Sequence, residues 1–174
     1  MKVPKMVHGY LACAALALSA CVRAQEPASL SVSDVRVETD LTAVSSRTAA
    51  AYWGNLSSDL SSAIAAEFVG QTAPDGWVVI VDIDEIALAN LFQARAGADD
   101  ARLTGDVALV DPASEEVDRV YTVSASANEA APFLTGSQDI VTLSPTSAEF
   151  YAAVVRAFAR GVADTLRAGA PAEI

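Results

Sequence analysis

Histidine, lysine, cysteine and methionine are absent from this 174-residue chain beyond position 21. The lone histidine, both methionines, both cysteines and the only two lysines all lie at or before Cys21. Downstream of it, nine arginines against 22 acidic residues give a formal charge of −13. A nucleophile activated by histidine, a Schiff-base lysine, a lysine-bearing phosphate loop and a Cys/His zinc site are therefore excluded from that part of the chain.

The acidic excess excludes further classes. Nucleic acids require a basic face, and anionic lipid repels an acidic protein, so neither is an expected electrostatic partner. No disulfide can form beyond Cys21, although an oxidising compartment would allow one. We therefore predict a protein that is not an enzyme and that has no catalytic residue, cofactor or metal.

The N-terminus has the features of an export signal. Residues 1–10 hold Lys2 and Lys5 and no acid, and residues 11–20 (LACAALALSA) are apolar or small throughout. This pattern predicts a signal peptide over residues 1–20, with an apolar run shorter than the roughly 20 residues that span a bilayer.

The end of this signal resembles the bacterial lipobox. Leu18-Ser19-Ala20-Cys21 places a leucine, two small residues and a cysteine in the order that directs acylation of the cysteine. The resemblance implies that Cys21 is the first mature residue and carries a palmitate-type anchor, and Val22 after it favours the outer membrane. The alternative is ordinary cleavage after Ala24, which would release a soluble periplasmic protein.

Beyond a short tether over residues 21–28, the hydrophobic pattern predicts one domain over residues 29–168 and a disordered tail over 169–174. A first strand with a bulge near Ser33-Asp34 precedes a helix whose apolar stripe ends before Gly70. Residues 77–83 predict a central strand, because both faces are apolar. Residues 103–123 predict a hairpin that turns at Asp111-Pro112, and a long helix follows residues 144–146.

This order, β-α-β-β-β-α, predicts an α/β (α+β) two-layer sandwich. We expect a mixed or antiparallel sheet of about four strands with both helices on one face, because two amphipathic helices need a common apolar surface. The other sheet face is more polar, and we expect it to meet solvent or a partner. A capping box of Thr146 and Glu149 is expected at the last helix, after a loop over residues 128–143.

The lipobox followed by this element order resembles small periplasmic α/β lipoproteins. One group is the auxiliary lipoproteins of envelope ABC-type transport systems, whose pattern matches Tyr52-Trp53, residues 79–84, the hairpin and the last helix. The other contains the curli-secretion lipoprotein, the penicillin-binding-protein activators and the first domain of TolB. Neither resemblance implies a catalytic residue.

Besides Cys21, three places are candidate sites. Asp82, Asp84 and Glu85 form an acidic cluster beside a strand. The cluster could bind a cation, or two of its carboxylates could hydrolyse glycosides. The same pattern is also typical of solvated acids that pair with nearby arginines, here Arg95, Arg102 or Arg119. Tyr52 lies off the apolar stripe of its helix and is a candidate partner contact. Phe133 and Leu134, in the predicted loop, are expected as an exposed apolar pair that binds a partner.

Three functions follow from these features. The first is a lipid-anchored, non-enzymatic binding, scaffold or assembly module with a protein partner in the cell envelope. The second is the auxiliary lipoprotein of a lipid-handling ABC-type system, and the third is a hydrolase that uses Asp82 and Asp84.

Overall fold

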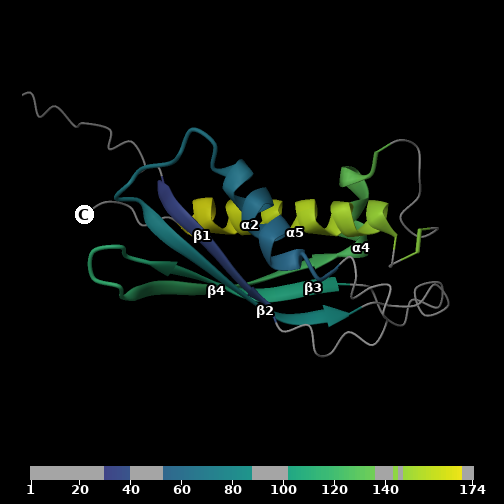
Figure 1. The fold of residues 1–174 in the computed structure, drawn as a ribbon, viewed down its shortest axis with the longest axis horizontal. Coiled ribbons are helices and arrows are strands. Elements are labelled where there is room, and N and C mark those ends of the chain that lie inside the picture. Colours follow the sequence, from purple (N-terminus) through teal and green to yellow (C-terminus); the bar gives the residue numbers. More distant parts are fainter. Residues whose placement is uncertain (1–29, 40–52, 88–101, 136–142, 145–146, 170–174) are drawn as a thin grey trace, which may run out of the picture.

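A computed structural model describes residues 30–39, 53–87, 102–135, 143–144 and 147–169. The elements confirm the expected order and add a short helix and a 3-10 turn before the last helix (Figure 1). In chain order they are β1 (Val32–Thr39), α2 (Leu56–Glu67), β2 (Trp77–Ala87), β3 (Arg102–Val110), β4 (Val117–Ser126), α4 (Ala127–Ala130), η2 (Ala131–Phe133) and α5 (Ala148–Gly169).

The four strands form one mixed sheet in the order β1-β2-β3-β4. β1 runs parallel to β2, and the other two neighbouring pairs are antiparallel. The predicted central strand, β2, lies between β1 and β3, and the predicted bulge is a register shift between Val32 and Asp34. The mixed two-layer α+β fold is therefore the one that the hydrophobic pattern predicts.

Both long helices cover the same face of the sheet (Figure 1). All five residues of the predicted stripe on α2 are at most 1% exposed, and every fourth residue of α5 from Phe150 to Leu166 is buried with them. Burying each large side chain contributes roughly 1.5–3 kcal/mol, so this single core supplies most of the stability. The stripe consists of Trp53, Leu56, Leu60, Ile64 and Phe68.

Strand β1 is an edge strand, and several of its outward backbone groups already have hydrogen-bond partners. The hydroxyl of Ser57 donates to the carbonyl of Val37, and that of Ser61 donates to the carbonyl of Val35 at 2.9 Å. At the start of the strand, the amide of Val32 donates to the carbonyl of Gln71 at 2.9 Å. Helix α2 therefore both covers the core and closes this edge against pairing with another chain.

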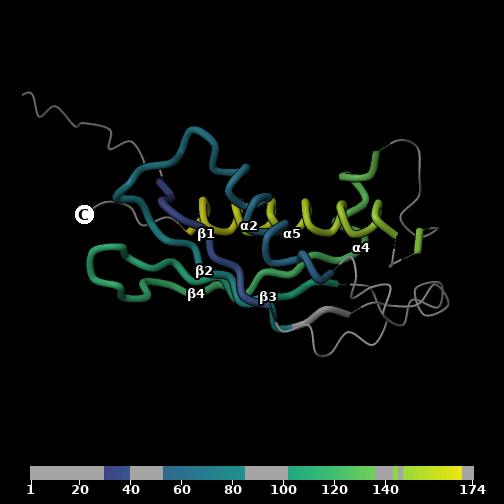
Figure 2. The backbone as a smooth tube through the Cα atoms, viewed as in Figure 1, coloured from purple at the N-terminus to yellow at the C-terminus, as the bar shows by residue number. Residues whose placement is uncertain are grey.

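The β3–β4 turn begins at Asp111 as expected, but it is wider than a type I turn. The amide of Glu115 donates to the carbonyl of Asp111 at 2.8 Å, one residue beyond the expected closure. The Asp111 carboxylate accepts from the amide of Ala113 at 2.7 Å, and Glu115 adopts a φ of 57°. The hairpin projects beyond the C-terminal end of α5 (Figure 2).

The loop expected over residues 128–143 is partly helical. Ser126 and Glu129 form a reciprocal capping box at the start of α4. A capping box is expected from the sequence only at the last helix, so this one is an addition. At α5, Thr146 lies outside the described residues, and it is the Ser147 hydroxyl that accepts from the amide of Phe150 at 3.2 Å. No helix among the described residues combines the length and apolarity needed to cross a bilayer.

Two arginines of α5 hold the end of α2: Arg160 forms an ion pair with Glu67 at 2.9 Å, and Arg167 makes the larger set of contacts. Helix α2 stops before Gly70, whose φ of 84° suits glycine. The Arg167 guanidinium donates to the carbonyl of Glu67 at 2.6 Å and to the side chain of Gln71 at 3.2 Å, and it lies 5.3 Å from the ring centre of Phe68. Arg167 thus caps one helix from the other.

We expect Arg167→Ala to lower the free energy of unfolding by about 1–2 kcal/mol, because a charged cap and a cation–π contact are lost together. Arg156→Ala is the matched control, since Arg156 is exposed on the same helix; it should change stability by less than about 0.5 kcal/mol. Urea unfolding followed by tryptophan fluorescence measures both. Equal effects of the two variants would contradict the capping role.

Candidate binding surface

Two predicted site residues lie outside the described residues. Cys21 precedes the first described position, and Tyr52 immediately precedes Trp53. The predicted leader and tether, and the tail from residue 170, lie outside them too. The roles of Cys21 and Tyr52 therefore stay predictions.

Phe133 and Leu134 are not the exposed pair that the sequence predicts. Both are only partly exposed and pack against the core beneath η2. The expectation failed because the segment from residue 127 to 133 is helical and turns these side chains toward α5, which a proline and a glycine nearby did not indicate. The predicted contact of Phe133 and Leu134 with a partner therefore loses its basis, which was the exposure of both side chains.

Asp82 and Asp84 are exposed, as expected of acids beside a strand. Asp84 lies at a register shift and has no partner residue in β3. Neither carboxylate forms an ion pair among the described residues, and Arg119 pairs instead with Asp118 at 3.3 Å. Glu85 belongs to β2, opposite Thr104, and only its backbone position is described.

Strand register places Asp82 in a line of acids that sequence analysis missed. Glu38 of β1 is the partner of Asp82, and Asp82 is the partner of Asp106 of β3. All three are exposed on the face of the sheet that no described helix covers. At the end of the line, Thr122 of β4 donates to the Asp106 carboxylate at 2.7 Å. Glu38, Asp82 and Asp106 are called the acid row below.

The acid row is an electrostatic cost. Like charges that lie directly opposite on neighbouring strands destabilise a sheet, and strands are spaced by only about 4.8 Å. No grouping of three His, Cys, Asp or Glu among the described residues has a geometry that could hold a metal ion. The row is therefore a concentration of negative charge on an open surface.

Apolar side chains adjoin the acid row on the same face. Their strand partners show that they form one area across β2, β3 and β4: Val78 lies opposite Val110 and Ile80 opposite Ala108. In β4 the side chains are well exposed, Val117 at 57% and Val120 at 59%. The valine patch is defined here as Val78, Ile80, Ala108, Val110, Val117 and Val120.

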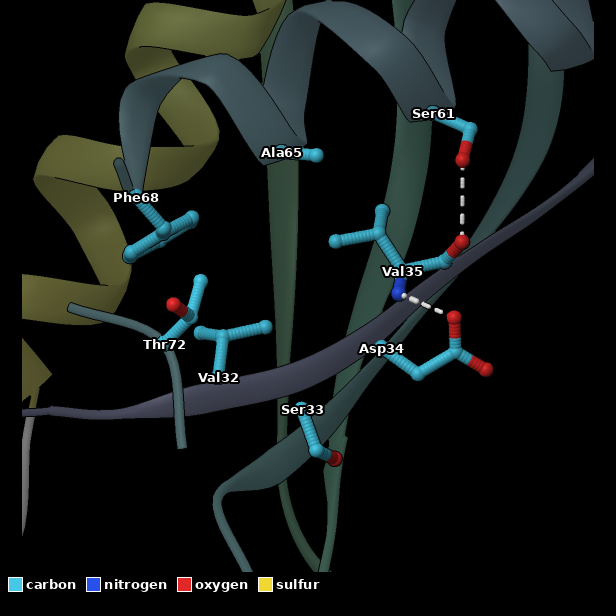
Figure 3. Close-up of a pocket in the computed structure, with 8 residues that line it drawn as sticks. All are labelled: Val32, Ser33, Asp34, Val35, Ser61, Ala65, Phe68 and Thr72. Carbon is cyan, nitrogen blue, oxygen red and sulfur yellow. Dashed lines mark hydrogen bonds between the residues drawn. The ribbon is translucent and has the colours of Figure 1, made fainter. Parts of the chain in front are cut away.

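A small hollow lies where α2 meets the bulge of β1 (Figure 3). It encloses about 180 Å³, and the side chains of Val35, Ala65 and Phe68 turn toward its interior. Two of its polar side chains are already paired, since the Ser61 hydroxyl donates to the Val35 carbonyl and the Asp34 carboxylate accepts from the Val35 amide at 2.9 Å. The hollow has room for a few atoms and presents no catalytic pair.

A shallow groove of about 380 Å³ separates the outer sides of α2 and α5. Tyr151 lies in it and donates to the Asp59 carboxylate at 2.6 Å, with its ring 5.2 Å from that of Trp53 in an edge-on contact. Burial, assisted by the hydrogen bond to Asp59, raises the pKa of the Tyr151 phenol above its ordinary value. This pair joins the two helices at the end opposite Arg167.

No family model matches this chain, and neither does the sequence of any curated protein. Solved structures of similar fold include a provisionally assigned lipoprotein from Caulobacter crescentus, at 14% identity over 76% of this chain and 88% of that chain, with a TM-score of 0.40. A minor lipoprotein from Acinetobacter baumannii matches at 14% identity over 78% and 92%, with a TM-score of 0.37. A PelC dodecamer from Paraburkholderia phytofirmans matches at 11% over 74% and 88%, with a TM-score of 0.35.

At these identities and TM-scores, the function of the chain has to be argued from its own residues. Two of these structures are themselves described as lipoproteins, and the resemblance of this chain to bacterial lipoproteins stays a prediction. The finer resemblances, to transport auxiliaries and to the TolB group, stay predictions.

Removing the central charge of the acid row should stabilise the fold. We expect Asp82→Asn to raise the free energy of unfolding by about 0.5 kcal/mol at low salt, because two like-charge contacts disappear, and the gain should shrink as salt screens them. Asp75→Asn, at an exposed turn residue, is the control and should have no effect. A loss of stability in Asp82→Asn would mean that this carboxylate has a favourable partner.

Tyr151→Phe should cost about 1 kcal/mol near neutral pH through the lost hydrogen bond to Asp59. Because the pKa of Tyr151 is raised on folding, its contribution is complete below the ordinary tyrosine pKa of about 10 and is lost as the pH rises beyond it. The stability difference between wild type and variant should therefore shrink above about pH 10. Urea unfolding across this pH range measures it, and a constant difference would contradict the shift.

Proposed function

We propose that this chain is a lipid-anchored protein of the bacterial cell envelope that binds another envelope component with the sheet face opposite α2 and α5 and catalyses no reaction. The anchor is Cys21, exposed at the periplasmic side, with the outer membrane as the favoured location. The domain that begins near Leu30 is the binding module.

The short connection between anchor and domain supports this arrangement. Only eight residues separate Cys21 from Leu30, the first described residue. Fully extended, that length of chain spans about 30 Å. The domain is therefore held close to the bilayer, where its acidic surface favours a protein partner over the anionic lipid beside it.

The single observation that carries the binding role is the sheet face that none of the described helices covers. A sheet that is buried on one side alone normally alternates apolar and polar residues, with the polar ones outside. Here the outer side also bears the valine patch, with Val117 and Val120 more than half exposed. A contiguous exposed apolar area on a soluble domain is typical of an interaction site.

The proposal that the chain catalyses no reaction rests on the residue types it contains. Beyond Cys21 the chain has no histidine, lysine or further cysteine, and Asp82 and Asp84 stand on an open face rather than in the described hollow or groove. Carboxylates that hydrolyse glycosides need an enclosed site that positions both the sugar and a water. A binding role demands none of these groups.

The anchor is tested by labelling cells with radioactive palmitate. Wild-type protein should carry the label and sediment with membranes, and Cys21→Ala should lose the label and accumulate as an unprocessed precursor. Cys13→Ala is the matched control, because Cys13 lies inside the apolar run, and it should behave as wild type.

An unacylated mature protein that starts at Gln25 would overturn the anchor. Turnover of a cell-wall glycan by the purified protein that is lost in Asp82→Asn would overturn the non-enzymatic role and favour the hydrolase hypothesis.

A further inference from the structure

We propose that the valine patch and the acid row form one docking surface, and that its occupant is a partner protein with an apolar strip flanked by lysine or arginine side chains. This inference rests on the proposed binding function and names the chemistry of the partner. It follows from the position of the two features, from the charge at both ends of the patch and from the cost of the row.

The two features are contiguous. Asp82 and Asp106 lie two residues along their strands from Ile80 and Ala108, on the same side of the sheet. Alternate residues of a strand are about 6.5–7 Å apart, so the row begins where the patch ends. A partner that covers the patch with apolar groups therefore brings its neighbouring side chains against three carboxylates.

The charge of the row selects cations. Three carboxylates in line repel one another in the free protein, and an opposing lysine or arginine would replace that repulsion with attraction. The basic residue that β1 contributes to this face, Arg36, is already held by Asp34 at 2.9 Å. The arginine near the patch, Arg119, is bonded to Asp118 and to the end of α5 at Gly169.

A second copy of the chain fits the surface poorly, because the far end of the patch is acidic too. The hairpin loop there carries Asp111, Glu115 and Glu116. If two copies stacked patch to patch with their strands antiparallel, the row of each would face the hairpin loop of the other. If the strands ran the same way, row would face row. Both arrangements set acid against acid.

An anionic membrane is disfavoured as an occupant, because its negative surface would face the acids at both ends of the patch. The patch is also about the right width for a protein element, since three strands span roughly 10 Å, which is the diameter of a helix with its side chains. The occupant we infer is therefore a basic, partly apolar protein surface.

The test is photo-crosslinking in living cells with the full, anchored protein. Benzoylphenylalanine replaces Val120 in the patch or, as a matched control, Val69, a valine that is 79% exposed beyond the end of α2. Val120 should crosslink to a protein other than the chain itself, and mass spectrometry should place the contact in a peptide that contains lysine or arginine. Val69 should not give this product.

Charge variants in the crosslinking background separate the row from the patch. Asp82→Asn should lower the Val120 crosslink severalfold and Asp82→Arg about tenfold, because reversal sets cation against cation. Glu149→Gln, which removes one exposed charge from the helical side, should leave the yield within about twofold of the parent. Circular dichroism of each purified variant establishes that it is folded.

The proposal would be overturned by a Val120 crosslink to a second copy, by a crosslink to lipid alone, by a contact in an acidic peptide, by a yield that Asp82→Arg does not change, or by the absence of any Val120 product. The anchor is judged separately. Palmitate labelling of Cys21 with no Val120 product would leave the lipoprotein assignment standing and end the docking proposal. A Val120 crosslink to a basic peptide in a protein that carries no palmitate label would support the docking proposal and end the lipoprotein assignment.

Discussion

Alternate residues of the four strands point into a core on one side of the sheet, where α2 and α5 cover it and α4 and η2 add to it, and this one-sided burial is the constraint on which the other features depend. The α2 stripe is almost fully buried, and α5 contributes a second row of buried residues at intervals of four. With no disulfide possible beyond Cys21, this core and its polar clasps have to hold the fold. Those clasps lie at opposite ends of the helix pair, where Tyr151 donates to Asp59 and Arg167 donates to the carbonyl of Glu67, the last residue of α2. Because both long helices are on one side, none of the described helices covers the other side of the sheet.

The same helix that covers the core also determines which parts of the sheet are available. Hydroxyl groups of Ser57 and Ser61 occupy carbonyls on the outer edge of β1, and the segment after α2 bonds the start of that strand. A strand-adding partner is therefore excluded from this edge along much of its length. The face of the sheet carries no such protection among the described residues. Contact through side chains of the face is thus better supported than strand addition at β1.

The sequence pattern was enough to predict element order, the α2 stripe, the central strand and the β1 bulge, because each depends on local periodicity. It was not enough for the acid row. Glu38, Asp82 and Asp106 are separated by 44 and 24 residues, and only strand register brings them opposite one another. The prediction that Phe133 and Leu134 are exposed was wrong for a related reason, since a short capped helix turns these side chains toward the core. Pairing and tertiary packing, which no window of residues contains, decided both cases.

The acid row argues against the idea that the sheet face opposite α2 and α5 serves only to keep the protein soluble. A sheet face that served only solubility would gain by mixing charges, because opposite charges on neighbouring strands attract and like charges repel. Nine arginines are present after Cys21, yet Asp82 and Asp106 have none of them as an ion-pair partner among the described residues. A sheet that keeps three like charges abreast, beside exposed valines, retains two unfavourable features in one place. Both become favourable when a surface of complementary charge and polarity covers them, and functional sites are where proteins commonly accept such local costs.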